Sequence, residues 1–130
     1  MRSPWIAVGA FSAAVAVLLG AFGAHGLKAH VSEADLEIWK TGVLYHAIHS
    51  LALVLFGLFQ ERRRTSSAPG ALFLAGIVIF GLTLYGIGIG GPGWLGAITP
   101  IGGLALVAGW VLFGIQAVRS GNVPRGPGET

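Results

Sequence analysis

The uncharged stretch that decides the fold reads ALFLAGIVIFGLTLYGIGI at residues 71–89. It belongs to a longer run, residues 65–118, that contains no Asp, Glu, Lys or Arg. A helix needs about 20 apolar residues to cross a hydrocarbon core. The run is therefore too long for one membrane span and predicts two, which excludes most classes of soluble enzyme.

Two further uncharged stretches, residues 3–27 and 41–60, each have the length of one span. Of the 130 residues, 54% are apolar and only 10% are charged, whereas about 25% of the residues of a soluble domain are charged. The sequence predicts an all-α membrane protein, a four-helix transmembrane bundle in one domain of residues 1–119. The expected spans are residues 4–24, 43–59, 71–89 and 100–118, followed by a disordered cytoplasmic tail at 120–130.

The segment between the first two spans has the pattern of an amphipathic helix. Ser32 and Asp35 resemble a capping box, and Leu36 and Trp39 follow at helical spacing. We therefore expect a short helix on the outer membrane surface, with a bend at Gly42 before the second span begins.

The fourth span is expected to begin at Thr99-Pro100, because Ser or Thr caps a helix and Pro is favoured at its first residue. Trp110 then falls near the middle of this span. Its indole N–H needs a hydrogen-bond partner there, since lipid supplies none.

Basic residues set the expected orientation, because cytoplasmic loops are rich in Lys and Arg. With both termini in the cytoplasm, only Lys28 and Lys40 face outward. This asymmetry accounts for the net charge of +3, so we expect no nucleic-acid partner. The absence of cysteine excludes disulfides and thiolate metal sites. The cytoplasmic side would hold the expected topology anchors Arg62, Arg63 and Arg64, together with Arg2, Arg119 and Arg125.

Small residues at four-residue spacing predict where the helices pack, since helices in lipid associate through close backbone approach. The same property favours association with other membrane helices. We therefore expect a homo-oligomer or a subunit of a larger membrane complex. The expected packing residues are Ala16, Gly20 and Ala24 in the first span, Gly86 and Gly90 in the third, and Ala105 and Gly109 in the fourth.

Ionisable side chains within the second span are the main candidates for a functional site. His46 and His49, three residues apart, share a helix face, and burial in a membrane is costly without a partner or a role. Because the first two spans are antiparallel, we expect His25 and His49 to lie within hydrogen-bonding reach near the outer face. The expected polar cluster comprises His25, His46, His49, Tyr45, Tyr85 and Thr99.

Three interpretations of this cluster remain open. The histidines can hydrogen-bond to hydroxyls or carbonyls and hold the helices together. They can instead ligate a metal or haem, since His at i and i+3 can share an ion, or they can relay protons or line a small-molecule pocket. No carboxylate lies within a span, and no phosphate loop or nucleophile elbow is present. We therefore expect no enzymatic activity and no bound cofactor, with metal or haem at the histidines as the alternative.

Five segments of the chain follow one another in a distinctive order: GAFGAHG at 20–26, WKTGVLYHAIH at 39–49, LY at 84–85, TPIGG at 99–103 and GW at 109–110. Together they resemble the domain of unknown function 423 family, which includes the transmembrane protein 256-like proteins. The family pattern has a polar residue, often Gln, where His46 stands, and Ser-Gly-Ser where this chain has residues 81–83. The resemblance implies a small four-helix protein of a bacterial plasma membrane or a mitochondrial inner membrane, without an established activity.

The expected function is therefore structural: a bundle that self-associates or serves as an accessory subunit. The alternative is a histidine-lined site near the outer face that binds a metal, haem or a small molecule.

Overall fold

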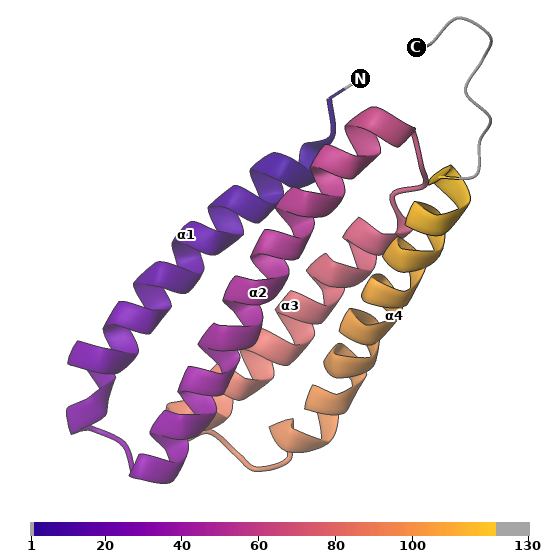
Figure 1. Ribbon diagram of the computed structural model, residues 1–130. Helices are drawn as coiled ribbons and strands as arrows, with labels where there is room; N and C mark the ends of the chain where they lie inside the picture. Colours follow the sequence, from indigo (N-terminus) through magenta and orange to yellow (C-terminus); the bar gives the residue numbers. More distant parts are fainter. Residues whose placement is uncertain (1, 122–130) are drawn as a thin grey trace, which may run out of the picture.

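The computed structural model describes residues 2–121, which fold into four long helices and one short 3-10 turn. All four helices are long and apolar enough to cross a membrane, so the predicted all-α fold with four spans is confirmed. The helices are α1 (Pro4–His25), α2 (Glu33–Arg63), α3 (Ala68–Gly88) and α4 (Leu95–Gly121), and the turn η1 (Leu27–Ala29) follows α1 (Figure 1).

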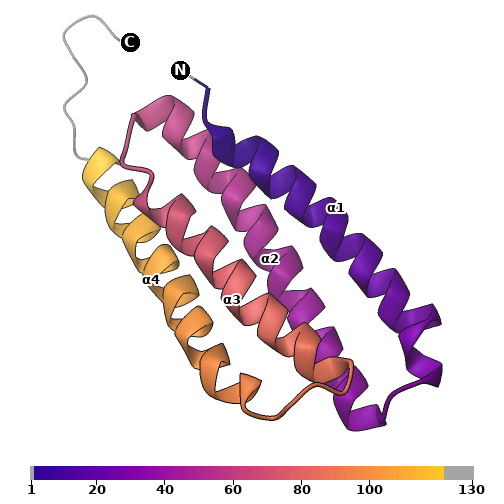
Figure 2. The ribbon, with the colours of Figure 1, turned by 180° about the vertical axis from the view of Figure 1, so that it is seen from behind.

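The four helices pack mainly against their neighbours in the sequence. Extensive contacts join α1 to α2, α2 to α3 and α3 to α4, whereas α2 and α4 touch only locally. Figures 1 and 2 show α1 and α4 at opposite edges of the molecule. Accordingly, 17% of the apolar segment is buried in α1 and in α4, against 44% in α2 and 39% in α3. The bundle is open, with a central pair of helices and two edge helices.

The core lies between the two central helices. Phe56 and Phe73 are fully buried, and both pack against Phe113 of α4 at their edges. Lipid tails are as apolar as these side chains, so their association is stabilised by close packing rather than by exclusion of water. The buried core residues are Ala52, Leu53 and Phe56 of α2 and Phe73 and Ile77 of α3.

Glycines allow the backbones of neighbouring helices to approach closely. A Cβ atom added to Gly9 of α1 would lie 2.6 Å from the carbonyl oxygen of Ser50 in α2. A Cβ atom added to Gly102 of α4 would lie 2.9 Å from the Cα atom of Phe80 in α3. Both contacts are with backbone atoms, which cannot move aside as a flexible side chain can.

The small residues of α1 face α2 at a different spacing from the one expected. Gly9, Ala16 and Gly23 are buried, so the contact recurs every seven residues, as it does between helices that cross at a small angle. Gly20 is half-buried beside Val43, and Ala24 is exposed. The expected stripe of Ala16, Gly20 and Ala24 is therefore wrong at Ala24, because four-residue steps drift around the helix.

Of the expected packing residues of α3 and α4, some contact a neighbouring helix and one does not. Gly109 is buried against the ring of Phe73, and Gly86 lies next to Leu95. Ala105 is half-buried. Gly90 does not pack at all: it is exposed, and its φ of 92° places it in the turn after α3.

The expected surface helix and second span form one continuous helix. Ser32 caps it by accepting a hydrogen bond of 3.1 Å from the backbone N–H of Asp35, and α2 then runs for 31 residues without interruption. Trp39 is 4% exposed and lies inside the bundle. A Cβ atom added to Gly42 would lie 3.1 Å from the ring of Tyr85. The bend predicted at Gly42 is therefore wrong, because this glycine permits close packing against α3.

Helix α4 begins five residues before the expected start. Its first turn is closed by backbone hydrogen bonds from residues 95–97 to the carbonyls three residues earlier. Pro100 then lies inside the helix. Near the start of a helix its missing N–H leaves only the carbonyl of Gly96, which is exposed, without a helical partner.

Both ends of the described chain lie at the same end of the bundle (Figure 1). The loop between α2 and α3 lies there too, whereas the other two connections lie at the opposite end. Helix α4 extends through Gly121. The remainder of the tail expected to be disordered, residues 122–130, lies outside the described residues.

The close approach at Gly9 predicts a stability effect. Replacing Gly9 by Ala should lower the free energy of unfolding in detergent by about 1–3 kcal/mol, because α1 and α2 must separate to admit the methyl group. The control is Gly114→Ala on α4, where an added Cβ atom meets nothing within 4 Å. This control should raise the free energy of unfolding by roughly 0.5–1 kcal/mol. Equal melting of wild type and Gly9→Ala would contradict the packing described above.

Candidate functional site

His46 joins three helices through hydrogen bonds in the middle of the bundle. Its Nδ1 lies 2.8 Å from the hydroxyl of Tyr85 in α3, and its Nε2 lies 3.0 Å from the hydroxyl of Ser12 in α1. Ser12 in turn lies 2.6 Å from the hydroxyl of Ser50. The Ser50 hydroxyl donates a 2.7 Å hydrogen bond to the backbone carbonyl of His46.

The order of donors in this network follows from the number of hydrogens available. Ser50 donates its only hydroxyl hydrogen to a carbonyl, so it must accept from Ser12. Ser12 has then used its own hydrogen, so it must accept from Nε2 of His46. His46 is thus protonated at Nε2, and its Nδ1 accepts from Tyr85. Every donor in the chain has one acceptor.

His49 forms a second connection, between α2 and α4. Its Nδ1 donates to the backbone carbonyl of Tyr45 within the same helix, and its Nε2 accepts a 3.0 Å hydrogen bond from the indole N–H of Trp110. The ring centroids of Trp110 and Phe73 are 5.0 Å apart. The two histidines therefore carry their protons on opposite ring nitrogens, although only three residues separate them.

The structure brings together some of the expected cluster. His46 contacts Tyr85, and the ring of Tyr45 stacks on His49 with a centroid distance of 6.0 Å. Thr99 lies apart from both histidine networks and donates to Thr83 at 2.8 Å. Tyr45 is 41% exposed, and its hydroxyl has no hydrogen-bond partner among residues 2–121.

His25 does not belong to this cluster. It is exposed at the end of α1, whereas His49 is close to the middle of α2, about 24 Å from the start of that helix at 1.5 Å per residue. The expectation that His25 and His49 lie within hydrogen-bonding reach is wrong. Its cause is the continuity of α2, which moves His49 from the outer quarter of the bundle to its centre.

Ser12 and Ser50 are the members of the network that the sequence analysis did not identify. The available signal was their position, since each is a hydroxyl residue inside an otherwise apolar span. Serine can also satisfy itself by bonding to its own helix, so the pattern alone does not reveal a partner on another helix. For Trp110, the predicted need for a partner is met by His49.

The described residues contain no group of three or more His, Asp or Glu side chains placed to hold a metal ion. Both ring nitrogens of His46 and of His49 already have partners. A metal or haem at either histidine would have to replace one of these hydrogen bonds. The described acidic residues lie in the first two turns and the last turn of α2; they are Glu33, Asp35, Glu37 and Glu61.

Two open grooves flank the histidines. The Ser12 groove, about 610 Å³, is bounded by α1, α2 and α3 and is lined by Ser12, Trp39, His46 and Tyr85 with apolar residues of α3. The Tyr45 groove, about 630 Å³, is bounded by α2, α3 and α4. Its lining includes Tyr45, His49, Phe80, Pro100, Leu106 and Trp110.

Comparisons with known proteins agree with this architecture. A family model described as "Protein of unknown function (DUF423)" matches residues 19–103. The UPF0382 membrane protein YwdK of Bacillus subtilis is 39% identical over 118 residues, which is 88% of this chain and 96% of that protein. The UPF0382 membrane protein SAB0533 of Staphylococcus aureus is 38% identical over 88% of this chain and 95% of its own length. No solved structure matches the chain.

The hydroxyl of Tyr85 should stabilise the fold, and the hydroxyl of Tyr45 should not. Tyr85→Phe removes the donor to Nδ1 of His46 and leaves that nitrogen unpaired, so the free energy of unfolding should fall by about 1–3 kcal/mol. Tyr45→Phe is the matched control, and we expect little change because its hydroxyl has no partner in the described chain. Chemical unfolding in detergent measures both. Equal effects of the two substitutions would show that the His46 network does not hold the helices together.

Proposed function

We propose, from the premise that this chain belongs to the DUF423 family of proteins of unknown function, that it is a non-enzymatic membrane protein that assembles with further copies of itself. The proposal rests on what the two edge helices expose. In a bilayer, bulky apolar side chains pack well against lipid, whereas small side chains favour contact with another helix.

Helix α1 exposes a stripe of small residues. Five alanines lie at intervals of three, four and seven residues along its outward side, where Val17 completes the stripe. This spacing keeps the residues on one helix face. They are Ala7, Ala10, Ala14, Ala21 and Ala24.

Helix α4 exposes mainly bulky residues and has no comparable stripe of alanines, whereas on α1 bulky residues such as Phe11 and Leu18 are exposed beside the stripe. Leu104 and Val118 are 69% and 68% exposed, and Val107, Val111 and Ile115 are also exposed. The two edge helices therefore differ, although each has the same small buried fraction. This difference favours α1 as the surface for assembly and α4 as a surface for lipid.

The polar groups in the bundle centre support a structural role. Both ring nitrogens of His46 and of His49 hydrogen-bond within the bundle, as do the hydroxyls of Ser12 and Ser50. Such a network positions helices, and its side chains are already hydrogen-bonded, so none of them is free to act as a nucleophile or general acid. We accordingly propose that the histidines fix the arrangement of the helices.

A second candidate function is the binding of a membrane-soluble small molecule, a metal or a haem. It is favoured by one observation, the Tyr45 hydroxyl, which is exposed beside a groove of about 630 Å³ and lacks a protein partner. This site would lie near the middle of the bundle rather than at its outer face. Absorption spectra, elemental analysis and mass spectrometry of solvent extracts from the purified protein would detect such a ligand.

Disruption of the alanine stripe should abolish assembly. Ala14→Leu adds bulk at the centre of the stripe, so it should convert the oligomer into a monomer in light-scattering measurements on detergent-solubilised protein. Ala117→Leu, the same change at an exposed site on α4, should leave the oligomer intact. A wild-type protein that is monomeric in native membranes by cross-linking would refute self-assembly. Co-purification with an unrelated subunit in fixed ratio would favour the accessory role.

We also propose that both termini lie in the cytoplasm of a bacterial cell. The proposal is supported by five arginines, Arg2, Arg62, Arg63, Arg64 and Arg119, at the end of the bundle that carries both termini, against Lys28 and Lys40 at the other end. The bacterial origin of the relatives supports the plasma membrane as its location.

The orientation can be tested with single cysteines, because the chain contains none. Asp35→Cys should react with a membrane-impermeant thiol reagent in intact cells, and Ser66→Cys should react only after the cells are opened. The two sites lie at opposite ends of α2. Labelling of Ser66→Cys in intact cells would reverse the orientation.

A further inference from the structure

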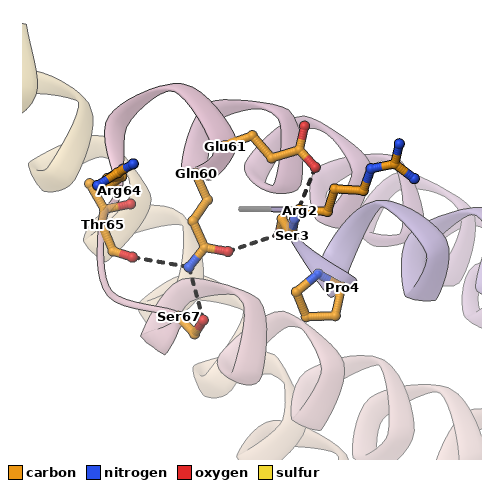
Figure 3. A pocket seen from close by; sticks show the side chains of 8 residues that line it. All are labelled: Arg2, Ser3, Pro4, Gln60, Glu61, Arg64, Thr65 and Ser67. Atoms are coloured by element: carbon orange, nitrogen blue, oxygen red, sulfur yellow. Dashed lines mark hydrogen bonds between the residues drawn. The ribbon is translucent and has the colours of Figure 1, made fainter.

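A polar pocket of about 340 Å³ lies at the arginine-rich end of the bundle, where α1 begins and α2 turns into α3 (Figure 3). It is separate from the histidine networks and from the alanine stripe. Its walls come from two segments that are distant in the sequence, residues 2–4 and 60–67. The lining residues are Arg2, Ser3, Pro4, Gln60, Glu61, Arg64, Thr65 and Ser67.

Gln60 holds the walls of this pocket in place. Its side-chain carbonyl accepts a 2.8 Å hydrogen bond from the hydroxyl of Ser3. Its amide group donates to the backbone carbonyl of Thr65 at 3.0 Å and to the hydroxyl of Ser67 at 2.9 Å. Figure 3 shows these three bonds radiating from one side chain. The pocket is thus pre-organised, which reduces the entropy lost when a ligand binds.

The pocket has more hydrogen-bond donors than acceptors. Arg2 and Arg64 stand at opposite sides of it (Figure 3), and within residues 2–121 neither guanidinium forms an ion pair or a hydrogen bond. Ser67 accepts from Gln60 and from the indole of Trp5, so its own hydroxyl hydrogen has no assigned acceptor. The side-chain oxygen of Thr65 is buried and also has no partner.

One acidic side chain partly offsets the positive charge of the two arginines. The carboxylate of Glu61 lines the pocket and accepts a 2.9 Å hydrogen bond from the backbone N–H of Ser3. It is thereby tied to the start of α1 and is not paired with either arginine. Two guanidinium groups against one carboxylate leave the pocket with a net positive charge.

We propose that this pocket binds the phosphodiester of an anionic phospholipid headgroup. A phosphodiester supplies acceptor oxygens and negative charge, which the pocket lacks, and guanidinium groups bind it through two parallel hydrogen bonds. The position fits as well, because the arginines at the ends of membrane helices lie at the depth of lipid headgroups. The acyl chains would extend along the apolar sides of the helices.

Native mass spectrometry of the full-length protein, titrated with phosphatidylglycerol or phosphatidylcholine, tests this proposal. The wild type should bind phosphatidylglycerol more tightly than phosphatidylcholine. Arg2→Gln and Arg64→Gln should each weaken binding of phosphatidylglycerol by about tenfold, as expected for the loss of one charge-assisted hydrogen-bonded contact. The two arginines are exposed and lie in different segments, Arg2 just before α1 and Arg64 just after α2, so failure of one variant to fold leaves the other for the test.

Arg62→Gln is the matched control. It removes the same charge from the same end of α2, but Arg62 does not line the pocket and so makes no direct contact with a headgroup bound there. Binding should therefore change by less than about twofold, which is the long-range effect of one screened charge. An equal loss in Arg62→Gln would overturn the proposal in favour of diffuse attraction to the surface. Equal binding of the two lipids would overturn it too. If inorganic phosphate alone displaces the lipid at the same affinity, the site is for free phosphate and the lipid assignment fails.

Discussion

The structure depends on one constraint: a polar group in the middle of a membrane must find its hydrogen-bond partner within the protein. His46 and His49 impose this constraint on the central helix α2. His46 bonds through its two ring nitrogens to α1 and to α3, whereas His49 bonds to the backbone of its own helix and to Trp110 of α4. Through these bonds the polar residues of α2 determine where α1, α3 and α4 sit.

Apolar packing then works within the frame that these hydrogen bonds define. Between α1 and α2 the helices approach through Gly9, Ala16 and Gly23. Between α3 and α4 they approach through Gly102 and Gly109, each against a phenylalanine. Close packing of this kind is insensitive to sequence detail on the outer sides, so α1 and α4 can present very different residues to their surroundings. Two independent features therefore determine the arrangement of the helices: the hydrogen bonds between polar side chains and the shape of the contacting helix surfaces.

Much of the fold could be predicted from the sequence because the membrane restricts the choices. Uncharged runs gave the number of spans, and Ser32 gave the start of α2. The break at Gly42 was wrong because glycine is compatible with both a bend and a close contact, and only the position of Tyr85 decides between them. That position is a property of the packed bundle.

The candidate site was less predictable than the fold, for a related reason. Histidines within a span indicate that hydrogen-bond partners exist in the protein, but the sequence pattern does not identify those partners. Tyr85 was identified because it lies at the expected depth, whereas Ser12 could have bonded to its own helix. The proton position on His46 depends on the direction of a whole chain of hydrogen bonds, from Tyr85 to the backbone of α2. That on His49 depends on the carbonyl of Tyr45 and the indole of Trp110. No short segment of sequence contains that information.

The two histidine networks also have a consequence for biogenesis. As the chain leaves the ribosome, α1 and α2 enter the membrane first, and this hairpin already contains Ser12, Ser50 and the carbonyls that their partners need. Two atoms of the hairpin still lack a donor at that stage: Nδ1 of His46, which awaits Tyr85, and Nε2 of His49, which awaits Trp110. The nascent hairpin therefore contains one unpaired acceptor for each helix that is still to be synthesised. Helices α3 and α4 can dock in their correct places because each carries the donor that one of these acceptors requires.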